Sequence, residues 1–211
     1  MAENKSGLHA IITLPRVFNF IQWVAGAKMY RNKMLQDYIK PFDGCRILDI
    51  GCGTGEYIDH LDDFCKEYEY YGFDGEAVYI DHAKKVFKDR KNVHFYLQIL
   101  TEDSIKDYEG FDMVIATGVL HHLDDQIVTS LLKVAKLALK PGGKFVSYDP
   151  GKFEKMSVLE NVFWKYDRGR SIRTVEQTEA LIKPIFPNYK AHTPYLTYYK
   201  SRNIVFECFN T

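Results

Sequence analysis

Residues 46–56, RILDIGCGTGE, are the stretch that decides the fold of this 211-residue chain. The stretch opens with a short apolar run, which is typical of a strand buried on both faces of a parallel sheet. Three glycines at alternate positions follow, and glycine adopts positive φ values and lets the backbone approach a ligand closely. We expect a helix over residues 55–65, whose first backbone N–H groups would lack helical partners. A strand that enters a helix through such a turn predicts a site for a nucleoside cofactor.

The spacing of the glycines and the charges around them narrow the kind of cofactor. A dinucleotide site has the pattern GxGxxG, in which the start of the helix receives a pyrophosphate. Residues 51–55 read GxGxG, one residue shorter, with Asp49 before the first glycine and Glu56 after the last. Two carboxylates would repel a pyrophosphate. The pattern favours a cofactor that carries a cationic amino group and a sulfonium.

The segments around the turn alternate between strand and helix patterns. Their apolar spacing predicts helices over 14–40, 55–65, 76–87 and 127–139, and strands at 45–50, 68–73, 93–97, 111–117 and 144–149. Such alternation is typical of βαβ units and a parallel sheet. Two further helices, 153–167 and 174–185, precede strands at 189–198 and 203–209, which are joined so briefly that they must pair antiparallel. The predicted fold class is therefore α/β, with a mostly parallel sheet that ends in a C-terminal antiparallel hairpin.

Composition and charge exclude several classes of protein. Apolar residues make up 46% of the chain, which is enough for a real core, and 28 basic residues balance 28 acidic ones. A protein that binds nucleic acid through its phosphates usually has a basic excess, so the balance argues against such a partner, although a local basic patch stays open. We expect no membrane span, because no apolar run approaches 18 residues. The N-terminus has no signal-peptide pattern.

The four cysteines point to the same kind of protein. Cys45, Cys52, Cys65 and Cys208 form neither a CxxC pair nor a zinc spacing. We therefore expect free thiols in a reducing, cytoplasmic compartment and no metal site.

Four segments, in order and in register, resemble motifs of the class I S-adenosylmethionine-dependent methyltransferases. They are LDIGCGTG at 48–55, YGFD at 71–74, FDMVIATGVLHHL at 111–123 and LALKPGGKF at 137–145. The resemblance covers residues 45–149 directly, and the layout of the whole chain agrees with it. It implies a three-layer, Rossmann-like, seven-stranded sheet, S-adenosylmethionine as the cofactor, and methyl transfer as the reaction.

The resemblance also implies which residues hold the cofactor. The first motif places Asp49, Gly51, Cys52 and Gly53 along the methionine and ribose portion, and the second places Asp74 and Gly75 at the ribose hydroxyls. The third places Thr117, Gly118 and Leu120 beside the sulfonium and its methyl group. Members of the family often have an acid after the third strand, facing the adenine amino group, but Ile99 stands at that position here. Gln98 or a backbone carbonyl is then left to make the adenine contact.

Three residues are candidates for contact or proton transfer with the methyl acceptor. His121, the first of the pair His121-His122, has an imidazole that could deprotonate a hydroxyl or an amine, although the pair also suits packing within the loop. Asp149 ends the fifth strand, where ligands enter this fold, but Asp149-Pro150-Gly151 is equally suited to a turn. Tyr30, on the first helix, would cover the methionine portion or the acceptor, or simply pack that helix onto the domain.

The chain as a whole is interpreted as one methyltransferase domain over residues 1–211. Residues 1–42 form an N-terminal helical lid, 43–149 the cofactor-binding core, and 150–211 a lid insertion with the C-terminal hairpin. Arg168, Arg170 and Arg173 in the insertion would grip a phosphate or carboxylate, or would form a solvated loop. The leading hypothesis is methyl transfer to oxygen, nitrogen or carbon of a small-molecule acceptor. Methylation of RNA or protein, and a catalytically silent cofactor-binding partner protein, are the alternatives.

Overall fold

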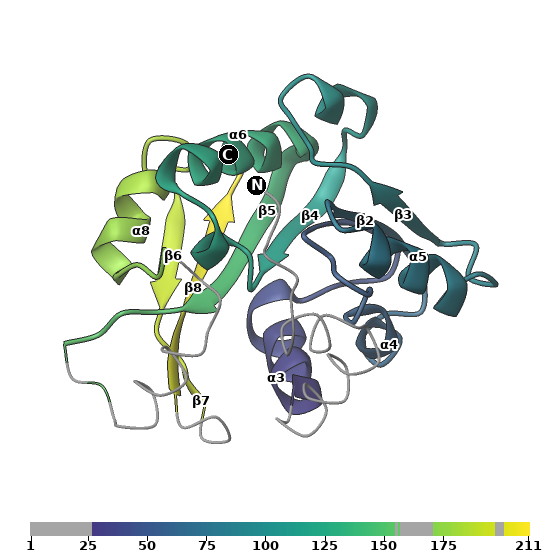
Figure 1. Cartoon of the computed structure of the whole chain (residues 1–211), viewed down its shortest axis with the longest axis horizontal. Helices are drawn as coiled ribbons and strands as arrows, with labels where there is room; N and C mark the ends of the chain where they lie inside the picture. The colour runs from purple at the N-terminus through teal and green to yellow at the C-terminus, as the bar shows by residue number, and fades with distance from the viewer. Residues whose placement is uncertain (1–26, 155, 157–170, 197–200) are drawn as a thin grey trace.

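β1 (Cys45–Ile50) is an interior strand of a mixed sheet, whose other strands are labelled in Figure 1. β2 (Tyr68–Asp74) and β3 (Val93–Leu97) follow on one side, and β4 (Phe111–Thr117) and β5 (Leu139–Pro150) on the other, all parallel. β8 (Ser201–Phe209) pairs antiparallel with β5, and β6 (Tyr189–His192) pairs antiparallel with β8. The computed structural model describes residues 27–154, 156, 171–196 and 201–211. Over these ranges the sheet has the order β3-β2-β1-β4-β5-β8-β6, which confirms the predicted seven-stranded, mostly parallel architecture.

Helices cover both faces of this sheet, so that the molecule has three layers. α3 (Ala27–Met34), α4 (Ile58–Leu61) and α5 (Ala77–Val86) pack on one face, and α6 (Asp125–Ala138) and α8 (Val175–Ile182) on the other. The two cores take alternate residues of each strand: Ile47 belongs to the first and Leu48 to the second. This follows from the period of two in a strand, which points successive side chains to opposite faces. Both are fully buried, as expected for central parallel strands.

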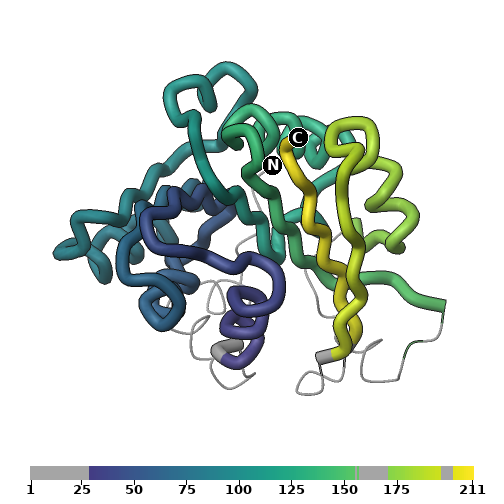
Figure 2. Tube along the Cα trace, turned by 180° about the vertical axis from the view of Figure 1, so that it is seen from behind, coloured from purple at the N-terminus to yellow at the C-terminus, as the bar shows by residue number. Residues whose placement is uncertain are grey.

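α3 lies at the edge of the sheet where the parallel strands end, as the views from the front and from behind agree (Figure 2). It continues into a π-helical turn, η1 (Leu35–Ile39), and ends at Lys40, which adopts a left-handed conformation with φ of 51°. Pro41 follows and cannot continue the helix. The predicted helix over 14–40 is thus present from residue 27 onward, and residues 14–26 lie outside the described part of the chain.

The structure departs furthest from the predicted boundaries in three places. The helix expected over 55–65 shrinks to α4, because the chain before it makes turns in which Gly55 donates to Cys52 and Ile58 to Gly55. β5 begins at Leu139, which already pairs with Phe111. The strand expected over 189–198 is broken into β6 and a two-residue β7 (Tyr195–Leu196), because Pro194 has no N–H to donate to a ladder.

Two further points complete the fold. The helix expected over 153–167 lies almost wholly outside the described residues. None of the helices within the described ranges is long and apolar enough to cross a membrane.

Candidate functional site

The carboxyl ends of β1, β2, β4 and β5 bring the predicted residues to one edge of the sheet. The register places Asp49 beside Gly72, Asp74 beside Leu97, and Thr117 beside Tyr148. Gly118 adopts a φ of 70° and donates to the Tyr148 carbonyl at 2.7 Å, so the chain turns away directly after β4. In open α/β sheets ligands bind beyond the carboxyl ends of the strands.

The glycine turn is fixed to the end of β2. Gly51 N–H and Cys52 N–H donate to the Phe73 carbonyl at 2.8 and 3.1 Å, and Gly53 N–H donates to Asp74 Oδ2 at 2.9 Å. Asp74 Oδ1 accepts from Glu76 N–H at 2.8 Å, at the start of α5. One carboxylate therefore joins the glycine turn to the next helix.

The glycines differ in the space around them. Gly51 and Gly53 have φ values of 76° and 55°. A Cβ on Gly51 would lie 2.6 Å from Val119 Cγ2, whereas a Cβ on Gly53 would meet nothing within 4 Å. Gly53 thus presents its backbone to open space, as a turn that cradles a ligand requires.

The residues after β3 lie next to Asp74. Gln98 N–H donates to the Asp74 carbonyl at 3.1 Å, and Ile99 packs beside Gly75 with 78% of its surface exposed. The structure therefore brings Gln98, Ile99, Asp74 and Gly75 together. An exposed apolar side chain at this point can cover the face of a base.

Asp49 is a buried acid, and one of its two carboxylate oxygens accepts no hydrogen bond. Its Oδ2 accepts a hydrogen bond from the Tyr70 hydroxyl at 2.6 Å, and its Oδ1 has no hydrogen-bond partner among the described residues. Burial raises the pKa of Asp49 to about 7, and the hydrogen bond from Tyr70 opposes this shift. Burial also raises the pKa of Asp74. A buried carboxylate oxygen without a partner is costly, which marks a position where a ligand can donate.

Three tyrosines, Tyr30, Tyr57 and Tyr148, lie together, and Tyr57 is the one next to Asp49. The rings of Tyr30 and Tyr148 lie 4.3 Å apart, centroid to centroid, so Tyr30 packs α3 against the end of β5. Tyr57, just before α4, is 3% exposed, and burial raises its pKa to about 12. The hydroxyls of Tyr30 and Tyr57 lie close to each other, and that of Tyr57 also lies close to Thr117 at the end of β4. Sequence reasoning missed Tyr57, whose only signal was its position two residues after the last glycine of the turn.

Glu56 does not face the cofactor as a bare carboxylate. It forms an ion pair with Arg31 of α3, and its Oε1 accepts from Thr54 Oγ1 at 3.1 Å. The argument that two free acids flank the glycines is therefore wrong for Glu56 and stands for Asp49 alone. The ion pair ties the N-terminal helix to the glycine turn.

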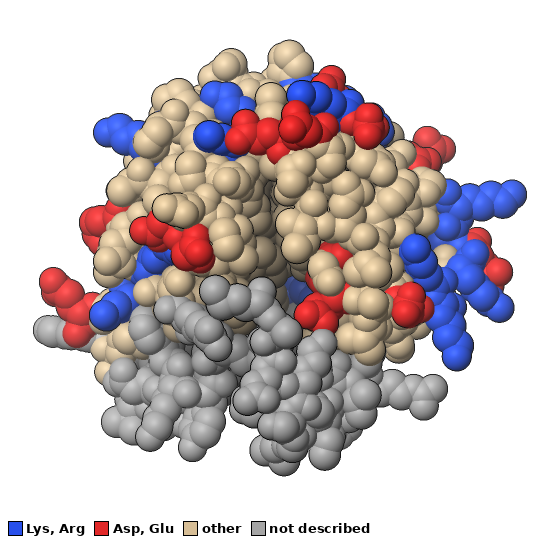
Figure 3. Space-filling model, turned by 45° about the horizontal axis from the view of Figure 1, so that its top comes forward, with Lys and Arg blue, Asp and Glu red and all other residues tan. Residues whose placement is uncertain are grey.

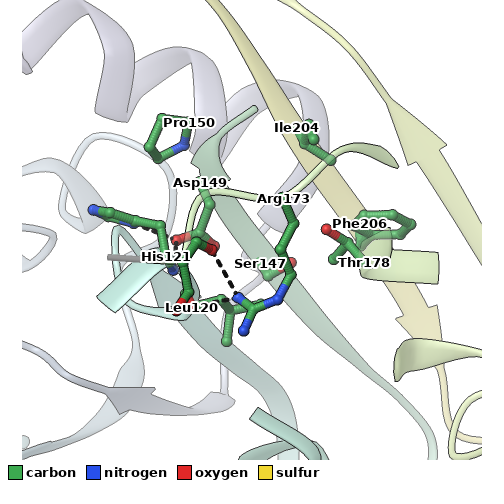
Figure 4. A pocket seen from close by; sticks show the side chains of 10 residues that line it. Leu120, His121, Ser147, Asp149, Pro150, Arg173, Thr178, Ile204 and Phe206 are labelled. Carbon is green, nitrogen blue, oxygen red and sulfur yellow. Dashed lines mark hydrogen bonds and ion pairs between the residues drawn. The ribbon is translucent and has the colours of Figure 1, made fainter. Parts of the chain in front are cut away.

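His121 and Asp149 form a buried pair (Figure 4). His121 Nδ1 donates to Asp149 Oδ1 at 2.7 Å, and His121 N–H donates to the same oxygen at 3.1 Å. Because a carboxylate oxygen accepts, Nδ1 carries the proton and Nε2 is the basic nitrogen of the ring. Asp149 is thus a side-chain partner of His121 rather than only a turn former. His122, by contrast, is exposed.

A cavity of about 20 Å³, large enough for one water molecule, adjoins this pair. Ser147 and Thr178 are among its lining residues, and Asp149 Oδ2 has no hydrogen-bond partner in the described part of the chain.

Arg173 holds the loop that carries His121. Its Nη1 donates to the Leu120 carbonyl at 2.8 Å, its Nη2 to the Leu123 carbonyl at 2.7 Å, and its Nε to Asp125 at 2.9 Å. Its donors are thus engaged within the protein, which argues against the hypothesis that Arg173 grips an acceptor anion. Arg168 and Arg170 lie outside the described residues. Leu120, whose carbonyl Arg173 holds, is buried.

Charges are mixed over the face of the molecule that Figure 3 shows. Acidic and basic side chains both occur across it, and basic ones gather at the right of the view. The described residues contain no group of three or more His, Cys, Asp or Glu side chains that could hold a metal ion.

These residues fit S-adenosylmethionine by their chemistry. The turn gives open space over Gly53, Asp74 gives a charged acceptor beside it, and Asp49 gives an unused buried acceptor for a cationic group.

Comparison with known proteins agrees with this fit. A family model described as a methyltransferase domain matches residues 48–145. The chain is 30% identical over 132 residues to a ubiquinone biosynthesis O-methyltransferase of Rhodopseudomonas palustris, covering 63% of this chain and 49% of that protein. It is 32% identical over 114 residues to a tRNA U34 carboxymethyltransferase of Pseudoalteromonas translucida, covering 53% and 34%. The chain thus spans at most half the length of these two relatives.

A solved structure shows the same fold. Phosphoethanolamine N-methyltransferase 2 of Haemonchus contortus, in complex with phosphomonomethylethanolamine and S-adenosylhomocysteine, superposes with a TM-score of 0.73 at 16% identity, covering 99% of this chain and 60% of that one. Residues 48–145 thus match a methyltransferase domain, and the sheet that contains them has the same fold as this solved methyltransferase.

Proposed function

We propose that this protein transfers the methyl group of S-adenosylmethionine to an oxygen, nitrogen or carbon atom of a small-molecule acceptor. The observation that carries the proposal is the position of Asp74, which joins Gly53 to the start of α5 beside open space. A carboxylate there can accept hydrogen bonds from two neighbouring hydroxyls of a ribose. Four buried free cysteines are consistent with a reducing, cytoplasmic setting.

The bound cofactor supplies a methyl group that is already activated as part of a sulfonium. The chain then has to hold the cofactor, align the acceptor and exclude water. In this proposal the glycine turn and Asp49 hold the methionine end, Asp74 and Gly75 hold the ribose, and Gln98 and Ile99 border the adenine. Thr117, Gly118 and Leu120 border the methyl group, and the remaining candidates, Tyr30, His121 and Asp149, lie toward the acceptor or close the cleft.

The first test separates binding from transfer. Calorimetry with S-adenosylhomocysteine should show one site per chain. Labelled S-adenosylmethionine should then place its label in the small-molecule fraction of a cell extract. Label found in RNA or protein instead would show that the acceptor is a macromolecule. Binding of S-adenosylhomocysteine without any methyl transfer would support the alternative of a catalytically silent partner protein. No binding at all would overturn the proposal.

His121→Gln should lower turnover by about 100-fold or more if His121 Nε2 removes a proton from the acceptor. The affinity for S-adenosylhomocysteine should stay unchanged, because the side chain is held toward Asp149 at the end of β5. His122→Gln, at the exposed neighbour, is the matched control and should keep full turnover. Equal turnover of the His121→Gln variant and the wild type would show that His121 is not the general base.

Cofactor affinity should rise with pH below neutrality. Burial raises the pKa of Asp49 to about 7, so this carboxylate is mostly protonated at pH 6 and half ionised at pH 7. Only the ionised form attracts the ammonium of the cofactor, so the dissociation constant of S-adenosylhomocysteine should fall by about fivefold between these pH values. Calorimetry at both pH values measures the change. Asp49→Asn should bind more weakly and lose this pH dependence, and an unchanged pH profile in that variant would exclude Asp49 as its source.

A further inference from the structure

One oxygen of Asp149 is buried beside a small cavity. Asp149 Oδ1 accepts from the ring and from the backbone N–H of His121, whereas Oδ2 has no hydrogen-bond partner among the residues that the structure describes. The cavity next to this carboxylate has a volume of about 20 Å³, the size of one water molecule (Figure 4). A buried carboxylate oxygen without a donor is costly, so a donor is expected at this position.

The walls of the cavity bring two hydroxyl groups to the same place. Ser147 lies two residues before Asp149 on β5, so both side chains point to the same face of the sheet. Thr178 comes from α8, which packs on that face. Its hydroxyl donates to the Thr174 carbonyl at 3.0 Å, so its oxygen can still accept. A carboxylate oxygen and two hydroxyls give a water molecule the two to four polar partners that it needs.

Arg173 also lines the cavity, but its guanidinium is directed at other acceptors. Nη1 donates to the carbonyls of Leu120 and Ser171, and Nε and Nη2 lie 2.9 and 2.7 Å from Asp125 Oδ1. The positive charge of Arg173 disfavours a second cation in the cavity, and the charge of Asp149 disfavours an anion. A neutral donor of this size is water.

We propose that the cavity holds one buried water molecule, which donates to Asp149 Oδ2 and is held by the hydroxyls of Ser147 and Thr178. The water fixes the carboxylate whose other oxygen holds the His121 ring. Thr178 of α8 is then a positioning residue for His121, because it acts through the water and Asp149. The water site is independent of the proposed function, and only its effect on methyl transfer rests on that function.

A high-resolution crystal structure of the ligand-free protein tests the water directly. One peak of electron density should lie within hydrogen-bond distance of Asp149 Oδ2 and of a hydroxyl of the cavity wall. Ser147→Val extends a larger side chain into the cavity and should lack the peak. A well-defined Asp149 side chain with no density beside Oδ2 in the wild type overturns the inference.

Thr178→Val tests the water through stability, because valine has nearly the shape of threonine and lacks the hydroxyl. Loss of a partner of the water should lower the melting temperature by about 3–6 °C. In a dry cavity the same change would add an apolar contact and would leave the melting temperature unchanged or higher.

Thr129→Val is the matched control for this measurement. The hydroxyl of Thr129 also donates to the carbonyl four residues earlier, that of Asp125 at 2.7 Å, but Thr129 is exposed on α6. Its loss should change the melting temperature by about 2 °C or less. A Thr178→Val variant that is no less stable than Thr129→Val overturns the inference.

The positioning role is tested with labelled S-adenosylmethionine and the small-molecule fraction of a cell extract. Thr178→Val should lower transfer by about 2- to 10-fold, and Thr178→Ser, which keeps the hydroxyl, should restore it. In the His121→Gln variant, Thr178→Val should cause no further loss, because its effect passes through His121. An equal loss in both backgrounds overturns the positioning role.

These outcomes separate the water site from the function. A wild-type protein that transfers no methyl group, but has the water and the expected loss of stability in Thr178→Val, overturns the proposed function and supports the water site. A protein that transfers methyl groups with a dry cavity overturns the inference and leaves the function standing.

Discussion

Asp74→Ala should weaken the binding of S-adenosylhomocysteine by about 1.5–3 kcal/mol, which is roughly 10- to 150-fold in the dissociation constant. The side chain would lose a charged acceptor for the ribose hydroxyls. It would also lose the acceptors of Gly53 N–H and Glu76 N–H, both of which Asp74 holds in the structure. The free energy of unfolding should therefore fall as well. Calorimetry gives the first quantity and denaturant unfolding the second.

Two further variants separate these effects. Asp74→Asn keeps one acceptor oxygen and loses the charge, so it should recover part of the stability while binding the cofactor weakly. Asp81→Ala removes an exposed acid of α5 and should change neither quantity by more than about 0.5 kcal/mol. An Asp74→Ala variant with wild-type affinity would show that the ribose assignment is wrong.

Gly51→Ala should lower the free energy of unfolding by about 2–4 kcal/mol and disturb cofactor binding with it. Gly51 has a φ of 76°, a conformation that costs an alanine energy, and its new Cβ would lie 2.6 Å from Val119 Cγ2. The two costs have different origins. The first belongs to the backbone of the turn, and the second to its packing against the loop after β4.

Gly142→Ala is the matched control. Gly142 has a φ of 79°, but a Cβ there would meet nothing within 4 Å. It should therefore show the backbone cost alone, about 1–2 kcal/mol. Adding Val119→Ala to Gly51→Ala should relieve the clash and bring its cost close to that of Gly142→Ala, apart from the methyl groups lost from Val119. If the single variants Gly51→Ala and Gly142→Ala lose the same free energy of unfolding, Val119 moves aside without destabilising the protein.

Much of the fold was predictable because it rests on local patterns. The strands were found from short apolar runs between turn residues, and the parallel pairing followed from their alternation with helices. The antiparallel hairpin followed from the short connection before residue 203. Pro194 signals a break within the strand predicted over residues 189–198, but the prediction ran the strand through it.

The details of the site were harder to predict, because they depend on contacts between residues that are distant in the sequence. Arg31 and Glu56 are 25 residues apart, and no periodic signal joins them. Sequence analysis named both His121 and Asp149, yet it did not join them, because their hydrogen bond depends on how the loop after β4 folds over β5. Tyr57 was missed because a tyrosine at the start of a helix usually serves packing. Only the structure shows that its hydroxyl is buried beside Tyr30 and Thr117.

The hydrogen bonds around Arg173 have a consequence for how this protein can be changed. Lys152 N–H donates to the Arg173 carbonyl at 2.9 Å, and Ser171 N–H donates to the His121 carbonyl at 3.0 Å. Lys152 and Ser171 are thus both fastened beside the loop that carries His121, Ser171 directly and Lys152 through Arg173. The two positions are natural junctions for an exchange of sequence: replacing the residues between them with those of another methyltransferase should leave the cofactor site as it is.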